Sequence, residues 1–299
     1  MQQLVIILGP TAVGKTNFAI KLANEFNGEI ISADSRQVYK GMDIGTGKDL
    51  DEYQLDGLKI PYHLIDIIEP HDEYNLFSFQ NDFYSSFSQI ISNNKLPFLV
   101  GGTGLYIHSI LKEYKLQNVD FNSDRAKELT QLDESELLVL LNNSKSSLHN
   151  TTDLIDKERI IKAILISESE KTNTPVEIKI KPLVLGITEI REIIKERITA
   201  RLKLRLQNGM IEEVENLISK GLSYDKLDFF GLEYRFISQY IKGELSYNDM
   251  FQKLNSSIHK FAKKQMTWFR KMEREGIEIN WLKSDETERA NLLISNFLE

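Results

Sequence analysis

Four short apolar runs in the first hundred residues have the length and composition of buried parallel strands. They are Leu4–Leu8, Glu29–Ala33, Pro61–Ile68 and Leu96–Val100. Two stretches between them, Asn17–Ala23 and Phe77–Ile91, carry apolar residues at helical spacing. Gly28 is expected to end the first of these helices. Strands that alternate with helices predict an α/β fold, in which helices flank a parallel sheet.

The pattern changes after Tyr114. Residues 115–181 are mostly polar and carry apolar positions at helical spacing, as in Glu158–Ile164. Leu183–Ile187 is again a continuous apolar run that predicts a strand, and Trp281–Leu282 predicts a last short one. We therefore expect a core built from residues 1–114 and 182–299, with a small helical domain, residues 115–181, inserted into it.

The composition of the 299-residue chain is that of an ordinary globular protein, with 41% hydrophobic and 27% charged residues. No apolar run is long enough to span a bilayer, so we expect neither a membrane anchor nor a signal peptide. The absence of cysteine excludes disulfides and thiolate metal sites, and favours a cytoplasmic protein. The formal net charge of −7 does not by itself indicate a nucleic-acid-binding protein.

A phosphate-binding loop is predicted directly after the first strand. The sequence GPTAVGKT fits G-x-x-x-x-G-K-[ST] and lies between a strand and a helix, as that motif requires. Its backbone N–H groups and the helix N-terminus would surround phosphate oxygens, Lys15 would reach the outer phosphate, and the Thr16 hydroxyl would hold Mg²⁺. The predicted loop residues are Gly9, Pro10, Thr11, Ala12, Val13, Gly14, Lys15 and Thr16.

Two further polar segments follow predicted strands at the same edge of the sheet. Asp34 comes after the second strand, and the glycine-rich turn Gly101–Gly104 comes after the fourth. Ligands of open α/β sheets bind outside the carboxyl ends of the strands, so we expect both segments beside the phosphate loop. By itself, Asp34 suits a helix cap, a Mg²⁺ ligand or a catalytic base.

Basic residues are concentrated in two segments of this acidic chain. Arg197, Arg201 and Arg205 recur every fourth residue and would share one helix face. Phe251–Met272 contains no acidic residue. In that segment, aromatic rings alternate with the cations Lys253, Lys260, Lys263, Lys264, Arg270 and Lys271. Such clustering favours contact with a polyanion.

A small-molecule kinase would explain the first hundred residues, with Asp34 as the base toward a hydroxyl acceptor. It would leave the inserted helical domain and the two basic segments without a role. A non-enzymatic P-loop protein that binds RNA is a further alternative.

Four motifs together closely resemble those of the tRNA dimethylallyltransferases. They are GPTAVGKT, DSRQVYKGMDIGTGK (Asp34–Lys48), LVGGTGLY (Leu99–Tyr106) and KKQMTWFR (Lys263–Arg270), in this order. The resemblance implies a P-loop NTPase-like fold and Mg²⁺ as cofactor. The implied reaction transfers a dimethylallyl group from dimethylallyl diphosphate to N6 of the adenosine 3′ of the anticodon, position 37 of a tRNA. Without cysteines for a zinc-finger module, the chain resembles the bacterial form, and we expect a monomer.

The resemblance also implies roles for individual residues. Asp34 matches the general base, Thr103 matches a threonine near the reacting adenine, and Arg125 matches an arginine that contacts the leaving group or the RNA. The tRNA-contacting positions match Asp34, Ser35, Arg36, Gln37, Glu158, Arg159, Ile160, Ile161, Lys162, Lys263, Gln265 and Arg270. Prenylation of free adenine nucleotides, as in cytokinin-forming relatives, is an alternative from the same chemistry.

The chain departs from the family pattern at two places. Glu158 stands where the family usually has glutamine at the start of Q-R-x-x-R. Glu233 stands where the family usually has the second glycine of G-I-G-Y.

Overall fold

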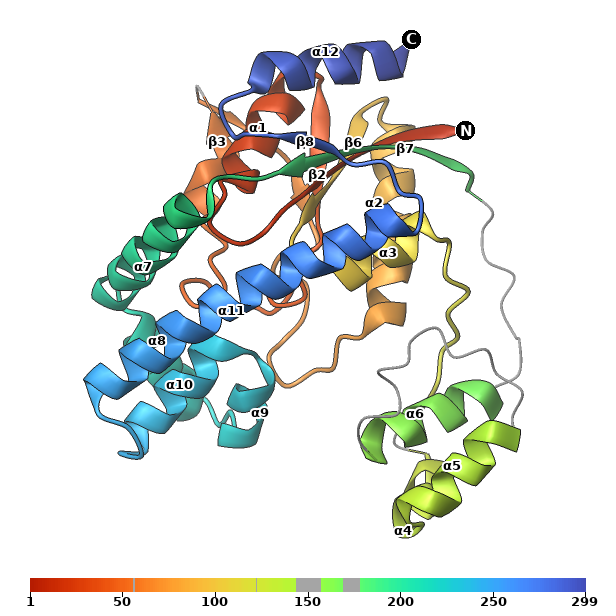
Figure 1. Cartoon of the computed structure of the whole chain (residues 1–299), viewed down its shortest axis with the longest axis vertical. Coiled ribbons are helices and arrows are strands. Elements are labelled where there is room, and N and C mark those ends of the chain that lie inside the picture. Colours follow the sequence, from red (N-terminus) through yellow and green to blue (C-terminus); the bar gives the residue numbers. More distant parts are fainter. Residues whose placement is uncertain (56, 122, 144–156, 169–177) are drawn as a thin grey trace. The chain divides into compact units, whose positions relative to one another are not determined.

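The computed structural model describes residues 1–55, 57–121, 123–143, 157–168 and 178–299 (Figure 1). The chain forms two compact units: Met1–Glu113 together with Ile178–Glu299, and Tyr114–Glu177. The second unit corresponds to the inserted domain expected at 115–181, of which residues 122, 144–156 and 169–177 lie outside the described ranges.

A six-stranded parallel sheet lies at the centre of the first unit, in the order β5-β2-β6-β1-β7-β8. Its strands are β1 (Gln2–Leu8), β2 (Gly28–Ser32), β5 (Tyr62–His63), β6 (Leu96–Gly101), β7 (Ile180–Ile187) and β8 (Asn280–Leu282). A short 3-10 turn, η1 (Leu50–Tyr53), leads into a separate antiparallel hairpin of β3 (Gln54–Leu55) and β4 (Leu58–Lys59). The predicted P-loop NTPase-like α/β class is confirmed.

Alternating side chains of β1 divide the core into two layers. Leu4, Ile6 and Leu8 belong to one buried cluster, and Val5 and Ile7 belong to another on the opposite face of the sheet. The second cluster includes α1 (Lys15–Glu25) and α12 (Thr287–Leu298). The first includes α2 (Leu76–Ser92), α3 (Gly104–Leu111) and residues of α11 (Tyr247–Arg274). Helices therefore cover both faces, as Figure 1 shows.

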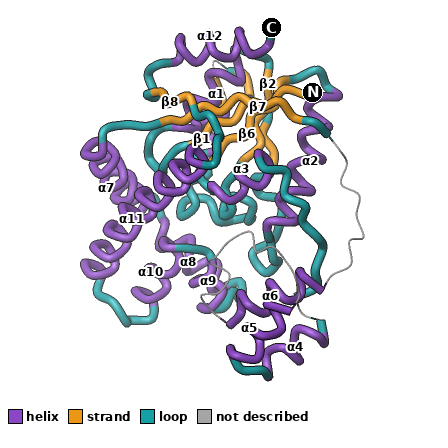
Figure 2. Tube along the Cα trace, turned by 45° about the vertical axis from the view of Figure 1, so that its right-hand side comes forward, coloured by secondary structure: helices purple, strands orange, loops and turns teal. Residues whose placement is uncertain are grey.

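Five helices between β7 and β8 extend the first unit beyond the sheet (Figure 2). They are α7 (Arg191–Gln207), α8 (Met210–Ser219), α9 (Tyr224–Phe229), α10 (Leu232–Ile241) and α11. The two basic segments of the sequence lie on α7 and α11, and the helix predicted for Arg197, Arg201 and Arg205 is confirmed. In the described part of the chain, no helix combines the length and the apolarity that crossing a bilayer requires.

The second unit is a small helical cluster. Its helices are α4 (Asp124–Gln131), α5 (Glu134–Asn143) and α6 (Lys157–Glu168). Leu129, Leu137 and Ile164 are among the side chains that form its own hydrophobic core. The predicted helical character of this segment is confirmed for these residues.

Two details of the predicted elements are wrong. The third strand, expected over Pro61–Ile68, is reduced to Tyr62–His63 because Leu64 and Asp66 take left-handed backbone conformations, with φ of 62° and 55°. Gly28 does not end α1 but begins β2. The chain reverses instead at Asn27, which has a φ of 49°. Asparagine tolerates this region better than most residues.

Candidate active site

A cavity of about 700 Å³ opens at the carboxyl edge of the sheet. It is lined by the segments that follow β1, β2 and β6, together with residues of α7, α10 and α11. This is the position at which open α/β sheets bind ligands. The phosphate loop, Asp34 and the glycine-rich turn, which the sequence predicts to lie together, all contribute to its wall.

Five of the eight predicted phosphate-loop residues line the cavity: Thr11, Ala12, Gly14, Lys15 and Thr16. Gly14 has a φ of 86°, which a glycine adopts without strain, and α1 begins at the next residue. The unsatisfied N–H groups at the start of α1 and the helix dipole therefore face the cavity. Gly9, Pro10 and Val13 are buried behind this wall.

Lys15 lies in this wall with its ammonium group held by the loop itself. Nζ donates a hydrogen bond to the carbonyl oxygen of Pro10 at 2.7 Å. Burial, with a further contribution from the charge of Arg201, lowers the pKa of Lys15 to about 7, and Asp34 acts in the opposite direction. The charged form of Lys15 is therefore only marginally favoured near neutral pH, and an anion that enters the cavity would stabilise it.

Arg201 and Arg205 bring two guanidinium groups to the cavity from α7. Arg201 Nη2 donates a hydrogen bond to the hydroxyl of Thr11, and burial followed by repulsion from Arg205 lowers its pKa to about 10. Arg205 pairs with Asp49 at 3.5 Å. The sequence indicated both arginines only as part of a basic helix face. Their four-residue spacing predicts that they share a helix face, but it does not predict that this face borders the cavity.

Asp34 and Thr103 occupy neighbouring positions at the ends of β2 and β6. Asp34 Oδ1 accepts the backbone N–H of Arg36 at 2.9 Å, and Thr103 Oγ1 accepts the backbone N–H of Ser35 at 3.1 Å. Ser35, Arg36 and Gln37, which the resemblance predicts to contact the tRNA, also line the cavity. These hydrogen bonds fix the backbone beside the carboxylate and leave Asp34 Oδ2 available to a ligand.

Gln265, which the resemblance predicts to contact the tRNA, also has a structural role in the cavity wall. It is only 8% exposed, and its amide joins two segments of the cavity wall. Oε1 accepts the N–H of Thr11 at 2.9 Å, and Nε2 donates to the carbonyl oxygen of Gly102 at 3.0 Å. Gln265 therefore holds the phosphate loop against the glycine-rich turn.

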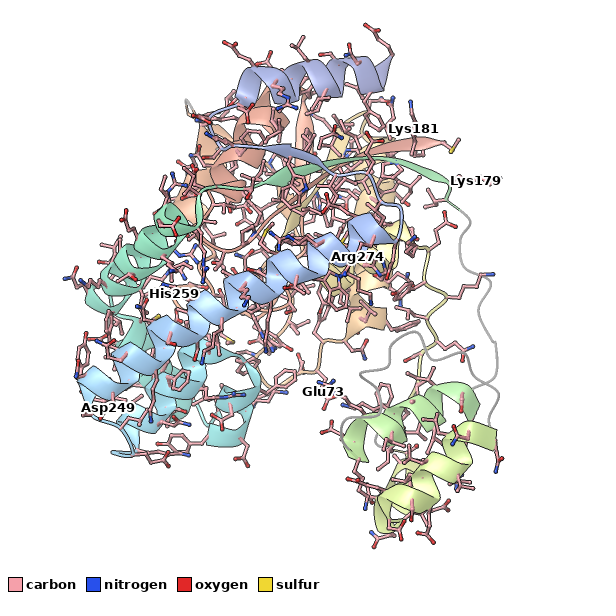
Figure 3. The ribbon with its side chains drawn as sticks, in the orientation of Figure 1. Glu73, Lys179, Lys181, Asp249, His259 and Arg274 are labelled. Atoms are coloured by element: carbon pink, nitrogen blue, oxygen red, sulfur yellow. The ribbon has the colours of Figure 1, made fainter. Side chains whose placement is uncertain are left out.

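The other predicted tRNA-contacting residues of α11, Lys263 and Arg270, are exposed on the helix surface. Figure 3 shows the side chains along this helix, with Asp249 near its start and Arg274 at its end. Lys264, which the sequence counted only within the basic segment, lines the cavity.

The segment between Asp34 and Lys48 is fixed by two charged side chains, Glu213 and Lys48. The Glu213 carboxylate of α8 accepts the backbone N–H groups of Asp43, Ile44 and Gly45 at 2.7–3.0 Å. The fully buried Lys48 ammonium bonds to the carbonyl oxygen of Tyr39 and pairs with Asp43 and Asp66. These contacts hold the wall of the cavity that contains residues 45–47.

The remaining predicted site residues belong to the second unit. Arg125 lies on α4 and pairs with Glu168 at 2.8 Å and with Glu128 at 3.1 Å. Glu158 and Lys162 pair with each other on the exposed side of α6, where Arg159 is also exposed. Ile160 and Ile161 are buried in the core of this unit, so their side chains are not on a surface that RNA could contact.

Glu233, the departure from the glycine pattern, lines the cavity in the first turn of α10. Burial raises its pKa, and the positive charges of Arg205 and Arg201 oppose that shift. Its carboxylate therefore shares the cavity with the two arginines. The local sequence does not predict that this acidic side chain faces the cavity.

The fold and the cavity together define a P-loop α/β protein. The family model described as IPP transferase matches residues 37–272, and that described as Isopentenyl transferase matches residues 2–63. This chain belongs to the IPP transferase family, that of the bacterial tRNA dimethylallyltransferases.

Curated relatives match nearly the whole chain. tRNA dimethylallyltransferase 1 of Geotalea uraniireducens is 51% identical over 283 residues, which are 94% of this chain and 93% of that protein. tRNA dimethylallyltransferase 2 of Bacteroides fragilis is 48% identical over 283 residues, 93% of this chain and 92% of that protein.

Solved structures show the same fold. The tRNA isopentenylpyrophosphate transferase of Bacillus halodurans is 30% identical with a TM-score of 0.71, covering 100% of this chain and 96% of that one. A eukaryotic dimethylallyltransferase acting on tRNA has a TM-score of 0.77 at 21% identity, covering 99% of this chain and 80% of that one.

Proposed function

We propose that this protein transfers a dimethylallyl group from dimethylallyl diphosphate to N6 of the adenosine at position 37 of tRNA. The observation that carries the proposal is the cavity itself. It combines an anion site, made of the phosphate loop, Lys15 and Arg201, with the carboxylate of Asp34. A leaving group and a proton acceptor are the two things that this reaction requires.

The diphosphate is both the part of the donor that the anion site binds and the leaving group of the reaction. As the bond between the allylic carbon and the diphosphate oxygen breaks, negative charge develops on that oxygen. Lys15, Arg201 and the N–H groups at the start of α1 are fixed around this position before the reaction, so stabilising the charge requires little reorganisation.

Mg²⁺ fits the oxygen atoms that the cavity provides. The Thr16 hydroxyl and the Asp34 carboxylate both line it, and Mg²⁺ commonly combines one or two protein oxygens with phosphate oxygens and water. Among the described residues, no group of three or more histidine, cysteine or acidic side chains could hold a metal without the donor. When bound, Mg²⁺ would neutralise charge on the diphosphate, and we assign Thr16 to it.

Asp34 is the proposed general base. Its Oδ1 is held by the N–H of Arg36, which orients the carboxylate toward the cavity. In the reaction, N6 of adenine forms a bond to the allylic carbon, diphosphate leaves with the bonding electrons, and the N6 proton passes to Asp34. Thr103 lies beside the same backbone and is assigned to the positioning of the adenine.

The acceptor must reach this cavity as an unstacked base. An adenine in an anticodon loop is stacked on its neighbours, so it has to flip out to bring N6 to Asp34. Arg36, Lys263, Lys264 and Arg270 provide cations at the cavity and along α11 for the RNA backbone. We also propose that the protein is a cytoplasmic monomer. Arg125 remains a predicted contact of the leaving group or the RNA, and Arg159 remains a predicted contact of the tRNA.

The test is prenyl transfer to an anticodon stem-loop with dimethylallyl diphosphate and Mg²⁺, in the absence of ATP. We expect a product heavier by one dimethylallyl group at the target adenosine, detected by mass spectrometry. A stem-loop with guanosine at that position is the control and should stay unmodified. Competition by AMP as strong as by the stem-loop would point to an adenine-nucleotide prenyltransferase instead. In a parallel reaction with added ATP and a hydroxyl acceptor, ATP consumption without prenyl transfer would point to a kinase.

A further inference from the structure

One face of α11 forms a continuous wall of the cavity. Ile258, Phe261, Lys264, Gln265 and Trp268 all line it, and their spacing of three or four residues places them on one side of the helix. Ile258 and Gln265 are buried, whereas Phe261 is 45% exposed. Phe261 therefore lies where this wall meets the solvent.

Trp268 lines the same wall but is only half-exposed. A Cβ atom on Gly104 would lie 2.2 Å from its indole ring, so the ring packs directly against the start of α3. This close packing fixes the indole ring, whereas the ring of Phe261, at 45% exposure, is the more accessible of the two aromatic rings that α11 brings to the cavity.

Among the large apolar side chains that are exposed in the described part of the chain, Phe261 and Leu105 are the two that line the cavity. A ligand that occupies the cavity would therefore come within reach of the exposed ring of Phe261.

The charges around Phe261 identify the kind of ligand. Lys260, Lys263 and Lys264 are neighbours of Phe261 on α11, and no acidic residue occurs from Phe251 to Met272. The acidic groups that line the cavity, Asp34, Asp49, Glu52 and Glu233, belong to other elements. An aromatic ring among lysines suits single-stranded nucleic acid, whose bases stack on the ring while its phosphates contact the ammonium groups.

We propose that Phe261 stacks on the base of a nucleotide next to the target adenosine, in place of the adenine that has flipped into the cavity. This inference rests on the proposed function. Flipping exposes one face of each neighbouring base, and stacking on an aromatic side chain recovers the contact that the RNA loses. Phe261 is thus a residue that recognises the unstacked loop rather than one that takes part in the chemistry.

The test compares Phe261→Ala with Tyr247→Ala. Tyr247 is a matched control because it is on the same helix and similarly exposed, at 49%, but does not line the cavity. We expect Phe261→Ala to raise the KM for the stem-loop about tenfold or more, with little change in kcat or in the KM for dimethylallyl diphosphate. Phe261→Trp should restore the KM, and Phe261→Leu should not.

A direct readout uses stem-loops with 2-aminopurine immediately 5′ or 3′ of the target adenosine. One of the two should be quenched in the complex with the wild-type protein and should become bright with Phe261→Ala. Equal fluorescence and equal KM for Phe261→Ala and Tyr247→Ala would overturn the inference, as would full rescue by leucine. Since wild-type prenyl transfer is measured in the same assay, its absence would reject the proposed function separately.

Discussion

The side-chain amide of Gln265 accepts a hydrogen bond from the backbone N–H of Thr11 at 2.9 Å. Through its other amide atom it also donates to Gly102, so one side chain of α11 holds the phosphate loop and the glycine-rich turn together. The bond to Gly102 is buried and the bond to Thr11 is partly buried, and leaving a buried polar group without its partner is costly. The geometry of the anion site therefore depends on a helix near the other end of the chain.

Replacing Gln265 by alanine should weaken both folding and donor binding. We expect a loss of about 1–3 kcal/mol in the free energy of unfolding, because the Thr11 N–H and the Gly102 carbonyl lose their partner. The KM for dimethylallyl diphosphate should rise as the loop loosens. Urea denaturation and initial rates measure the two effects, and Thr267→Ala, at an exposed position of the same helix, is the control. Wild-type values for both quantities would show that Gln265 does not hold the loop.

The affinity for the donor should fall as the pH rises above about 7. The pKa of Lys15 is lowered to about 7 by burial, and a bound diphosphate would favour the charged ammonium. Above pH 7, binding of the donor therefore requires uptake of a proton. The dissociation constant of dimethylallyl diphosphate should then increase by up to about tenfold per pH unit. Calorimetric titration from pH 6 to 9 measures this effect. Lys15→Arg, whose charge does not titrate in this range, should flatten the dependence.

The same lysine should affect stability with the opposite sign. The folded protein releases the Lys15 proton near pH 7, whereas the unfolded chain keeps it up to about 10.5. The unfolded state thus binds more protons between these values, and this residue's contribution makes the free energy of unfolding rise with pH there. In Lys15→Met that contribution is absent, so the difference in stability between the two proteins should change across this window. A difference independent of pH would contradict the lowered pKa.

Asp34→Asn should lower turnover far more than it lowers RNA affinity. Asparagine keeps an oxygen that can accept the Arg36 N–H, so the local backbone is preserved while the proton acceptor is lost. We expect kcat to fall by about 10²–10⁴-fold. Single-turnover rates and stem-loop binding by anisotropy separate the two effects, with Asp51→Asn on η1 as a control outside the cavity. If binding falls as much as the rate does, Asp34 positions the RNA rather than accepting the proton.

Lys263→Ala and Arg270→Ala should each weaken stem-loop binding and reduce its salt dependence. A side chain that contacts one phosphate contributes about one unit to the slope of log affinity against log salt concentration. Lys21→Ala, at an exposed position of α1, is the control and should leave the slope unchanged. Unchanged slopes for both Lys263→Ala and Arg270→Ala would show that neither side chain contacts a phosphate of the RNA.

Local patterns were sufficient to predict the sheet and the helices next to the phosphate loop. Leu4–Leu8 is apolar on both faces because helices cover both sides of β1, and that property is visible in the sequence. The third strand was predicted too long because the departure at Leu64 is a backbone feature without a proline or glycine to mark it.

The candidate site was less predictable where it depends on distant contacts. Asp34 and Thr103 followed from their places after strands. The positions of Arg201 and Gln265 depend on how α7 and α11 pack against the first loop, and no local periodicity contains that information. Ile160 and Ile161 are among the tRNA-contacting positions that the resemblance implies, but their apolar side chains are part of the hydrophobic core of the second unit.

The place of β7 in the sheet has a consequence for synthesis on the ribosome. β1 is made first and β6 pairs with one of its edges, but the other edge is paired by β7, which follows the whole second unit in the chain. The wall of the cavity is completed later still, by α11. A nascent chain therefore carries its phosphate loop and Asp34 long before it can use them. Catalytic competence should appear abruptly, when residues near the end of the chain have left the exit tunnel.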